Sequence, residues 1–259
     1  MKQAMRERVV WLWMLMIIAM AAMGQHTTRV SEPIKVMTYN VRHCAGMDLV
    51  VDYDRTAEVI LRQQPDVVAL QELDSVTGRS RQCDQLNELA SRTGYIPVFG
   101  GAIDYDGGKY GVGVLCSETP LSTKCIPLPG EEPRVLLVVE LKDYVIACTH
   151  LDLELEARMA SVPIIMEEAK QWKKPFLLVG DWNDTPDSEL VCELQRAFTI
   201  LSSPEVSYPA DQPLECLDYV ASYKNRKTRV LKSVVIDEPE ASDHRPVVVT
   251  LQVLAPILY

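Results

Sequence analysis

The stretch Phe176-Leu177-Leu178-Val179-Gly180-Asp181-Trp182-Asn183-Asp184 indicates the fold of this chain most directly. Its first four residues are apolar, as in a strand that is buried on both faces, and polar residues follow at once. A second junction of this kind lies near the C-terminus, where Ser242-Asp243-His244-Arg245-Pro246 precedes Val247-Val248-Val249. A buried carboxylate is costly unless it is paired or metal-bound. Polar clusters at the ends of buried strands therefore predict a functional site at the mouth of a sheet.

Strand-like and helix-like segments alternate along the rest of the chain. We predict strands over residues 34–41, 66–71, 111–116, 134–141, 144–149, 176–179, 217–221, 228–235 and 246–254, and helices over 55–63, 82–92, 154–173 and 188–198. Pro163 lies inside the third helix and predicts a kink, or a helix that starts near Ser161. Continuous apolar strands are covered on both faces. The predicted fold class is therefore α/β, a layered sandwich of two packed central β-sheets flanked by helices.

Length and composition predict one folded domain behind an export signal. The chain has 259 residues, 47% hydrophobic and 24% charged, without a Gly/Ser-rich linker, so residues 25–259 are expected to form a single domain. Residues 1–24 combine Lys2, Arg6 and Arg8 with an apolar run over 9–23, which is typical of a signal peptide cleaved after Gly24. The run is shorter than the ~20 residues of a membrane span. An uncleaved anchor is the alternative to a secreted or periplasmic protein.

The charge of the chain disfavours tight binding to a polyanion. The net charge is −10, and loss of residues 1–24, which carry a net +2, leaves −12. Dedicated nucleic-acid binders often have a pI above ~9, whereas this chain has a pI of about 5.0. A bound metal would still supply local positive charge. The seven cysteines fit no zinc spacing, and Cys116 and Cys148 read as small buried hydrophobes.

Seven short motifs occur in an order that resembles the endonuclease/exonuclease/phosphatase superfamily of DNase I-like, metal-dependent phosphoesterases. They are Thr38-Tyr39-Asn40-Val41-Arg42, Gln71-Glu72-Leu73-Asp74, Tyr110-Gly111, Thr149-His150-Leu151-Asp152, Gly180-Asp181-Trp182-Asn183, Leu217-Asp218-Tyr219-Val220 and Ser242-Asp243-His244-Arg245-Pro246. Each motif is weak alone, but together they extend from residue 34 to the C-terminus. The resemblance implies a DNase I-like fold and hydrolysis of phosphoester bonds.

The resemblance also implies a metal site. It places Asn40, Glu72 and Asp243 near a divalent cation, with Glu72 as the most direct ligand. Oxygen ligands of this kind suit Mg²⁺, which keeps several waters and leaves room for a substrate phosphate. Mn²⁺ and Ca²⁺ are alternatives. A surface cap or a paired buried charge is the structural alternative for Glu72.

Five further residues are implied to be catalytic. His244 would contact the scissile phosphate, with Asp218 behind it to fix its tautomer. Asp181 would position the attacking water, and Asn183 would hold a phosphate oxygen. His150 would act as a general acid or stabilise phosphoryl charge. The structural alternatives are a turn carboxylate for Asp218 and a hydrogen-bonded core histidine for His150.

Arg42, Tyr110 and Arg158 are weaker candidates for binding substrate. For the two arginines the reason is that lone arginines are more often solvated or paired.

We expect an exported, divalent-metal-dependent hydrolase that cleaves a P–O bond by in-line attack of water, as a phosphodiesterase or nuclease. A phosphatase acting on small molecules or on phospholipid head groups, as sphingomyelinases do, is the first alternative. A catalytically inactive phosphoester-binding protein is the second. The expected partner is a phosphoester substrate, with no protein partner and a monomeric state.

Overall fold

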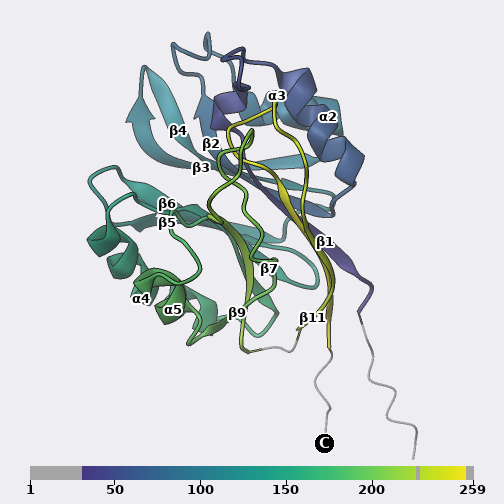
Figure 1. Cartoon of the computed structure of the whole chain (residues 1–259), viewed down its shortest axis with the longest axis vertical. Coiled ribbons are helices and arrows are strands. Elements are labelled where there is room, and N and C mark those ends of the chain that lie inside the picture. The colour runs from purple at the N-terminus through teal and green to yellow at the C-terminus, as the bar shows by residue number, and fades with distance from the viewer. Residues whose placement is uncertain (1–30, 226–227, 255–259) are drawn as a thin grey trace, which may run out of the picture.

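The structure is a computed structural model that describes residues 31–225 and 228–254 (Figure 1). The predicted export segment, residues 1–24, lies outside the described residues. Within the described part, no helix combines the length and the apolar character that crossing a membrane requires.

Two six-stranded sheets form the centre of the molecule. Among the described strands, only β1–β2 and β7–β8 are parallel pairs, and the other pairs are antiparallel. The first sheet has the order β11 (Thr228–Val235), β12 (Val247–Val253), β1 (Ile34–Asn40), β2 (Val67–Ser75), β4 (Gly108–Cys116), β3 (Ile96–Tyr105). The second has the order β5 (Ser122–Leu128), β6 (Arg134–Glu140), β7 (Val145–His150), β8 (Phe176–Asp181), β10 (Asp218–Tyr223), β9 (Phe198–Ile200).

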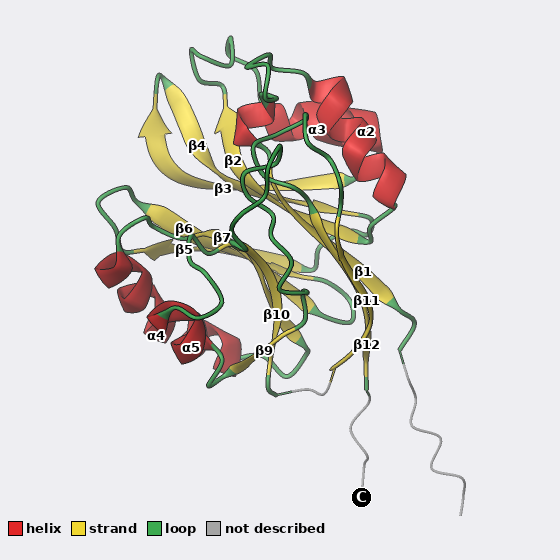
Figure 2. Ribbon diagram, viewed as in Figure 1, coloured by secondary structure: helices red, strands yellow, loops and turns green. Residues whose placement is uncertain are grey.

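The helices lie outside the two sheets, as Figure 2 shows. A short 3₁₀ turn, η1 (Arg42–Cys44), and the helices α2 (Tyr53–Gln63) and α3 (Gln85–Thr93) accompany the first sheet. The helices α4 (Leu155–Lys170) and α5 (Glu189–Leu194) cover the second. Both α2 and α3 start at an aspartate whose side chain accepts a backbone N–H of the first turn. This arrangement confirms the predicted layered α/β sandwich.

The core between the sheets explains the continuous apolar runs. Val36 and Val114 of the first sheet pack in one cluster with Leu137 and Val179 of the second, and all four are essentially fully buried. Their strands are covered by helices on the other face, so both faces of each strand are apolar. Cys116 and Cys148 belong to this cluster, as predicted.

Several predicted element boundaries were wrong. Strands β3 and β5 were missed because they lie at sheet edges, where most side chains are exposed or only partly buried. The predicted helix 188–198 ends at Leu194, and Phe198 starts β9 instead. Helix α4 starts at Leu155 and continues through Pro163, anchored by the buried Val162 and Ile165. Burial of the apolar face outweighs the missing proline donor there.

Candidate active site

Three neighbouring strands of the second sheet place three polar residues side by side. His150 at the end of β7 lies opposite Asp181 at the end of β8, and Asp181 lies opposite Asp218 at the start of β10. Residues directly opposite each other on adjacent strands project from the same face. Their exposed fractions are 6%, 1% and 1% in that order. The register of the sheet therefore brings an imidazole and two carboxylates together in a buried position.

The residue before Asp181 has to be glycine. Gly180 has φ +148°, and a Cβ there would lie 1.9 Å from the carbonyl oxygen of Thr149 on β7. Directly after Asp181, the backbone N–H of Trp182 donates to the carbonyl oxygen of Leu217. The Trp182 ring stacks on the Tyr219 ring, with the ring centres 4.4 Å apart. The close approach of β7 and the stacked rings fix the backbone on both sides of the carboxylate.

Asn40, at the end of β1, links the first sheet to this cluster. Its Nδ2 donates to Glu72 Oε1 at 2.9 Å and to Asp181 Oδ2 at 3.1 Å. Its Oδ1 accepts the backbone N–H of Arg42 at 3.1 Å. The hydroxyl of Ser242 donates to the Asn40 carbonyl at 2.7 Å, so the segment before His244 is tied to the same strand end. Asn40 is thus a bridge between the sheets, and its role as a metal ligand stays a prediction.

Glu72 lies within β2, not at its end as the sequence predicted. The register of β2 against β4 shifts between Leu70 and Leu73, and Glu72 has φ +59°. A bulge of this kind redirects a side chain, and a left-handed backbone at a non-glycine residue costs ~1–2 kcal/mol. Burial raises the pKa of Glu72, and the carboxylates of Asp243 and Asp181 add to the shift, whereas the hydrogen bond from Asn40 opposes it.

His244 is held by Asp218, the residue that the resemblance implies to lie behind it. The distance from His244 Nδ1 to Asp218 Oδ2 is 2.9 Å, and the Ser207 hydroxyl donates to the same oxygen at 2.6 Å. Burial lowers the pKa of His244, but the carboxylates of Asp218 and Asp181 outweigh burial and raise it to about 10. The His244 side chain is therefore an imidazolium at neutral pH, with Nε2–H directed into the cluster.

His150 has the opposite character. Burial lowers its pKa to about 3, and although Asp181 opposes this shift, Arg134 and His244 reinforce it. Its Nδ1 lies 3.3 Å from Nη1 of Arg134. A guanidinium only donates, so Nδ1 accepts and the single ring proton is on Nε2. His150 is therefore a neutral imidazole that offers an N–H to the cluster.

Three nitrogen groups converge on one oxygen of Asp181. The distances to Asp181 Oδ2 are 3.1 Å from Asn40 Nδ2, 3.6 Å from His150 Nε2 and 3.6 Å from His244 Nε2. The other oxygen, Oδ1, accepts the backbone N–H of Asn183 at 2.9 Å. Buried N–H groups that point at one position can stabilise an anionic oxygen there.

A cleft of about 310 Å³ opens beside this cluster. Its wall contains Glu72 and Asp243, so these two predicted metal ligands face the same space, together with Arg42 and Tyr110. Nε of Arg42 lies 3.4 Å from Asp243 Oδ2. The structure therefore brings two of the three weaker substrate-binding candidates to the predicted metal site.

The remaining predicted residues have other contacts. Asn183 donates its amide to the carbonyl oxygen of Leu151 at 2.7 Å, so it joins the loops after β7 and β8. Arg158 is buried, pairs with Asp184 at 3.1 Å and donates to the Asp152 carbonyl at 3.1 Å. Its charge is used within the fold, and binding of substrate by Arg158 stays a prediction.

The donor set of the cluster fits a hard divalent cation. Glu72, Asp181, Asp218 and Asp243 supply carboxylates around the single imidazolium of His244. Asp218 Oδ1 is buried without a hydrogen-bond partner in the described part of the chain. Oxygen donors and an excess of negative charge are what Mg²⁺, Mn²⁺ and Ca²⁺ prefer.

Two groups of residues are candidates to hold such a cation. Atoms of Asp181, Asp218 and His244 lie within 4.8 Å of one another, so these three residues could hold a metal ion. A cation bound through His244 would have to displace its proton, because an imidazolium has no free lone pair. The predicted group of Glu72, Asp243 and Asn40 requires no such proton loss.

Sequence reasoning missed three residues that support the site. Ser207 bonds Asp218, Arg134 bonds His150, and the Tyr208 ring lies 4.7 Å from the His244 ring. Ser207 and Tyr208 belong to an irregular loop without a periodic pattern, so nothing in the sequence marked them. Arg134 starts the predicted strand 134–141, and the pairing of this strand with β7, which carries His150, was a usable signal.

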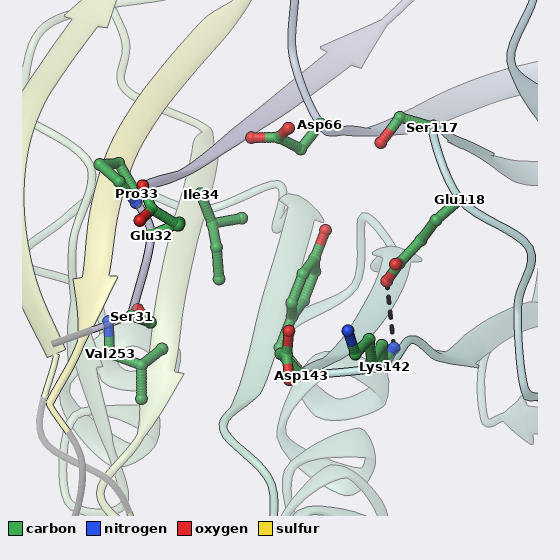
Figure 3. Close-up of a pocket in the computed structure, with 11 residues that line it drawn as sticks. Ser31, Glu32, Pro33, Ile34, Asp66, Ser117, Glu118, Lys142, Asp143 and Val253 are labelled. Atoms are coloured by element: carbon green, nitrogen blue, oxygen red, sulfur yellow. Dashed lines mark hydrogen bonds between the residues drawn. The ribbon is translucent and has the colours of Figure 1, made fainter. Parts of the chain in front are cut away.

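A larger cavity, of about 720 Å³, lies at the opposite ends of the strands (Figure 3). Its wall includes Ile34 at the start of β1 and Val253 at the end of β12, with Asp66, Glu118 and Asp143 around them. None of the predicted site residues lines it.

Comparisons with known proteins agree with this fold. The Endonuclease/Exonuclease/phosphatase family profile matches residues 37–244. An endonuclease/exonuclease/phosphatase from Beutenbergia cavernae is 24% identical with a TM-score of 0.72, covering 87% of this chain and 72% of that one. One from Bacteroides vulgatus is 18% identical with a TM-score of 0.72 (86% and 100% covered). A Bacteroides thetaiotaomicron mannosyl-6-phosphatase is 17% identical with a TM-score of 0.70 (84% and 99%). A comparison with curated protein sequences finds no match.

The two-sheet sandwich and the buried Asp/His cluster at its mouth define a hydrolase that acts on phosphoester bonds. The chain belongs to the Endonuclease/Exonuclease/phosphatase family.

Proposed function

We propose that this protein is an exported, divalent-metal-dependent phosphoesterase that cleaves a P–O bond of a small phosphoester by in-line attack of water. The observation that carries the proposal is the convergence of Asn40, His150 and His244 on Asp181 Oδ2. The export step rests on residues 1–24 of the sequence alone.

The side chains divide the chemistry between an acceptor and several donors. Asp181 is the buried carboxylate that orients the water and accepts its proton as the water oxygen bonds to phosphorus and the P–O bond breaks. The N–H groups of His244, His150 and Asn40 bind phosphoryl oxygens as negative charge accumulates on them. The low pKa of His150 favours this donor role over that of a general acid. Asp218 keeps His244 charged and oriented.

The cation would be held by Glu72 and Asp243, together with Asn40, which lies between Glu72 and Asp181. When bound, Mg²⁺, Mn²⁺ or Ca²⁺ supplies positive charge that stabilises the phosphoryl and leaving oxygens. Burial raises the pKa of Glu72, and the carboxylates of Asp243 and Asp181 raise it further; a cation would relieve this carboxylate repulsion.

Three observations favour a small substrate over a nucleic acid. The cleft beside Glu72 has about 310 Å³, near the lower end of the ~300–1,000 Å³ range of small-molecule pockets. The net charge of −10 offers little attraction for a polyanion, because nucleic-acid affinity comes mainly from lysine and arginine contacts to phosphates. The likeness to a mannosyl-6-phosphatase also supports this choice. Nuclease and phospholipid head-group activities are the competing candidates.

The test is phosphate release from small phosphomonoesters, and cleavage of bis(p-nitrophenyl) phosphate and plasmid DNA, with Mg²⁺ or with excess chelator. We expect metal-dependent turnover of the small esters, and we expect Glu72→Gln and His244→Ala each to lower kcat by ~10²–10³-fold or more with the fold retained. Glu167→Gln is the matched control, because Glu167 is exposed on α4 (71% side-chain exposure). Full activity in chelator, or in either site variant, would contradict the mechanism. Plasmid cleavage without turnover of small esters would favour the nuclease.

A further inference from the structure

One wall of the cleft is built around Arg79, a residue that has no role in the proposed mechanism. Arg79 lines the cleft together with Tyr105 and Tyr110, facing the same space as Glu72 and Asp243. Its guanidinium carbon lies 4.6 Å from the centre of the Tyr105 ring and 5.6 Å from that of Tyr110. Both distances are within the range of a cation–π contact.

The guanidinium is locked in place by a buried carboxylate. Nε and Nη2 of Arg79 form a fork with Asp74, at 2.6 Å and 2.8 Å, and the Asp74 side chain has 0% exposure. The Thr77 hydroxyl donates to the same carboxylate at 3.0 Å. A planar fork of this kind fixes orientation as well as position. The Arg79 side chain itself remains 35% exposed toward the cleft.

The loop that carries Arg79 is tied to the tip of the β3–β4 hairpin. The backbone N–H of Arg79 donates to Asp106 Oδ2 at 2.6 Å, and that of Gly78 donates to the Asp106 carbonyl at 2.8 Å. At Gly108, a Cβ would lie 2.3 Å from the carbonyl oxygen of Ser75, so only glycine allows this close approach. The loop and the hairpin therefore form one continuous wall.

The charges of this wall are already balanced. Among the described residues, Arg79 is paired with Asp74, Arg42 with Asp243, and Glu132 with Arg134. Burial lowers the pKa of His43, which also lines the cleft, and nearby Arg79 reinforces the shift. A second anionic group on the substrate would find no unpaired cation here. This part of the cleft therefore suits an uncharged group better than a second anionic one.

The chemistry of the wall fits a ring with apolar faces and a polar edge. The Tyr105 and Tyr110 rings, with centroids 6.4 Å apart and planes at 58°, offer aromatic faces, whereas guanidinium, imidazole and phenol groups offer hydrogen bonds. A sugar ring has this combination. A nucleoside adds a base to its sugar, and a cleft of about 310 Å³ already has to admit the phosphoryl group and one ring.

We propose that Arg79, Tyr105 and Tyr110 form a specificity subsite for the sugar ring of a monosaccharide phosphate. This inference rests on the proposed function, because the phosphoryl group must lie at the Glu72 side of the same cleft. Tyr105 contacts the ring of the substrate, and Arg79 positions Tyr105 and donates from its outer nitrogen.

The test compares a hexose 6-phosphate, glycerol 2-phosphate and adenosine 5′-monophosphate with Mg²⁺, by phosphate release. We expect kcat/KM for the hexose phosphate to exceed that for glycerol 2-phosphate by about tenfold or more, the scale of one lost apolar contact. Tyr105→Ala should remove this advantage through KM, with kcat retained and glycerol 2-phosphate unaffected. The matched variant Tyr105→Phe keeps the ring and should keep the advantage. These variants leave the buried Asp74–Arg79 pair intact, so the fold is retained.

Equal loss for all three substrates in Tyr105→Ala, or no loss, would overturn the subsite while the proposed function stands. A preference for the nucleotide that disappears in Tyr105→Ala would overturn it in favour of a base-stacking subsite. If neither the three esters nor bis(p-nitrophenyl) phosphate is turned over, the proposed function fails instead. Calorimetric titration of hexose 6-phosphate into the wild type and Tyr105→Ala then decides: weaker binding by the variant supports the subsite, and equal binding overturns it.

Discussion

At the scale of single residues, the site depends on how buried charges are matched. His150 and His244 lie at the same distance from Asp181 Oδ2, yet one is neutral and the other charged. The difference comes from the second neighbour of each ring, because Arg134 faces His150 whereas Asp218 faces His244. Two identical side chains in one cluster thus acquire different protonation states from the groups behind them.

We predict that Asp218→Asn lowers the pKa of His244 from about 10 toward the ordinary 6.5, because burial then acts against less negative charge. The folded pKa lies above the unfolded value, so the pair stabilises the fold fully below pH 6.5 and this stabilisation is lost as pH rises to about 10. NMR titration of the imidazole nitrogens in the metal-free protein measures the shift. The exposed Asp211→Asn is the control, and an unchanged His244 pKa in Asp218→Asn would contradict the assignment.

At the scale of elements, Gly180 combines a positive φ angle with close packing against the neighbouring strand. A comparison with Gly94 separates the effects of these two features on stability. We predict that Gly180→Ala destabilises the protein by about 3 kcal/mol or more, since strain of the backbone adds to a clash with the Thr149 carbonyl on β7. Gly94 also has a positive φ of +76°, but nothing lies within 4 Å of the position of a Cβ there. Gly94→Ala should cost only the ~1–2 kcal/mol of the left-handed conformation. Urea unfolding measures both, and equal losses would refute a close packing of β7 on β8.

At the scale of the whole molecule, function and stability compete at the junction of the sheets. We predict that Glu72→Gln raises the melting temperature of the metal-free protein at neutral pH, while abolishing turnover. The pKa of Glu72 is raised by burial and by Asp243 and Asp181, so its charged form opposes folding and stability falls as pH rises above 4.5. Thermal unfolding with chelator measures this, with Glu167→Gln as the control. A lower melting temperature would show that Glu72 stabilises the apo fold.

The sequence predicted those parts of the fold that depend on local pattern. Apolar runs such as Phe176–Val179 identified the buried strands, and the residues that end them, Asn40, His150 and Asp181, identified the mouth of the sheets. The edge strands β3 and β5 were not predictable in this way, because their side chains are only partly buried. The bulge that redirects Glu72 depends on the pairing of β2 with β4. Tyr110 of β4 lies 38 positions further along the chain, and a local sequence pattern does not indicate a pairing over that distance.

The supporting contacts of the site were harder to predict than its central residues. Ser207 reaches Asp218 from an irregular loop, and Arg79 contacts the Tyr105 ring while a buried carboxylate, that of Asp74, holds its guanidinium. Such contacts are set by tertiary packing, which leaves no periodic signal in the chain. The resemblance supplied catalytic roles for residues in motifs, but it was silent about the loops that surround them.

The amide of Asn40 belongs to one sheet and donates to carboxylates on both, Glu72 beside it and Asp181 opposite. A partly folded chain in which the two sheets have formed but have not docked would contain every catalytic residue but no assembled active site. Hydrolytic competence would therefore appear only at the last step of assembly, when the two halves close on each other.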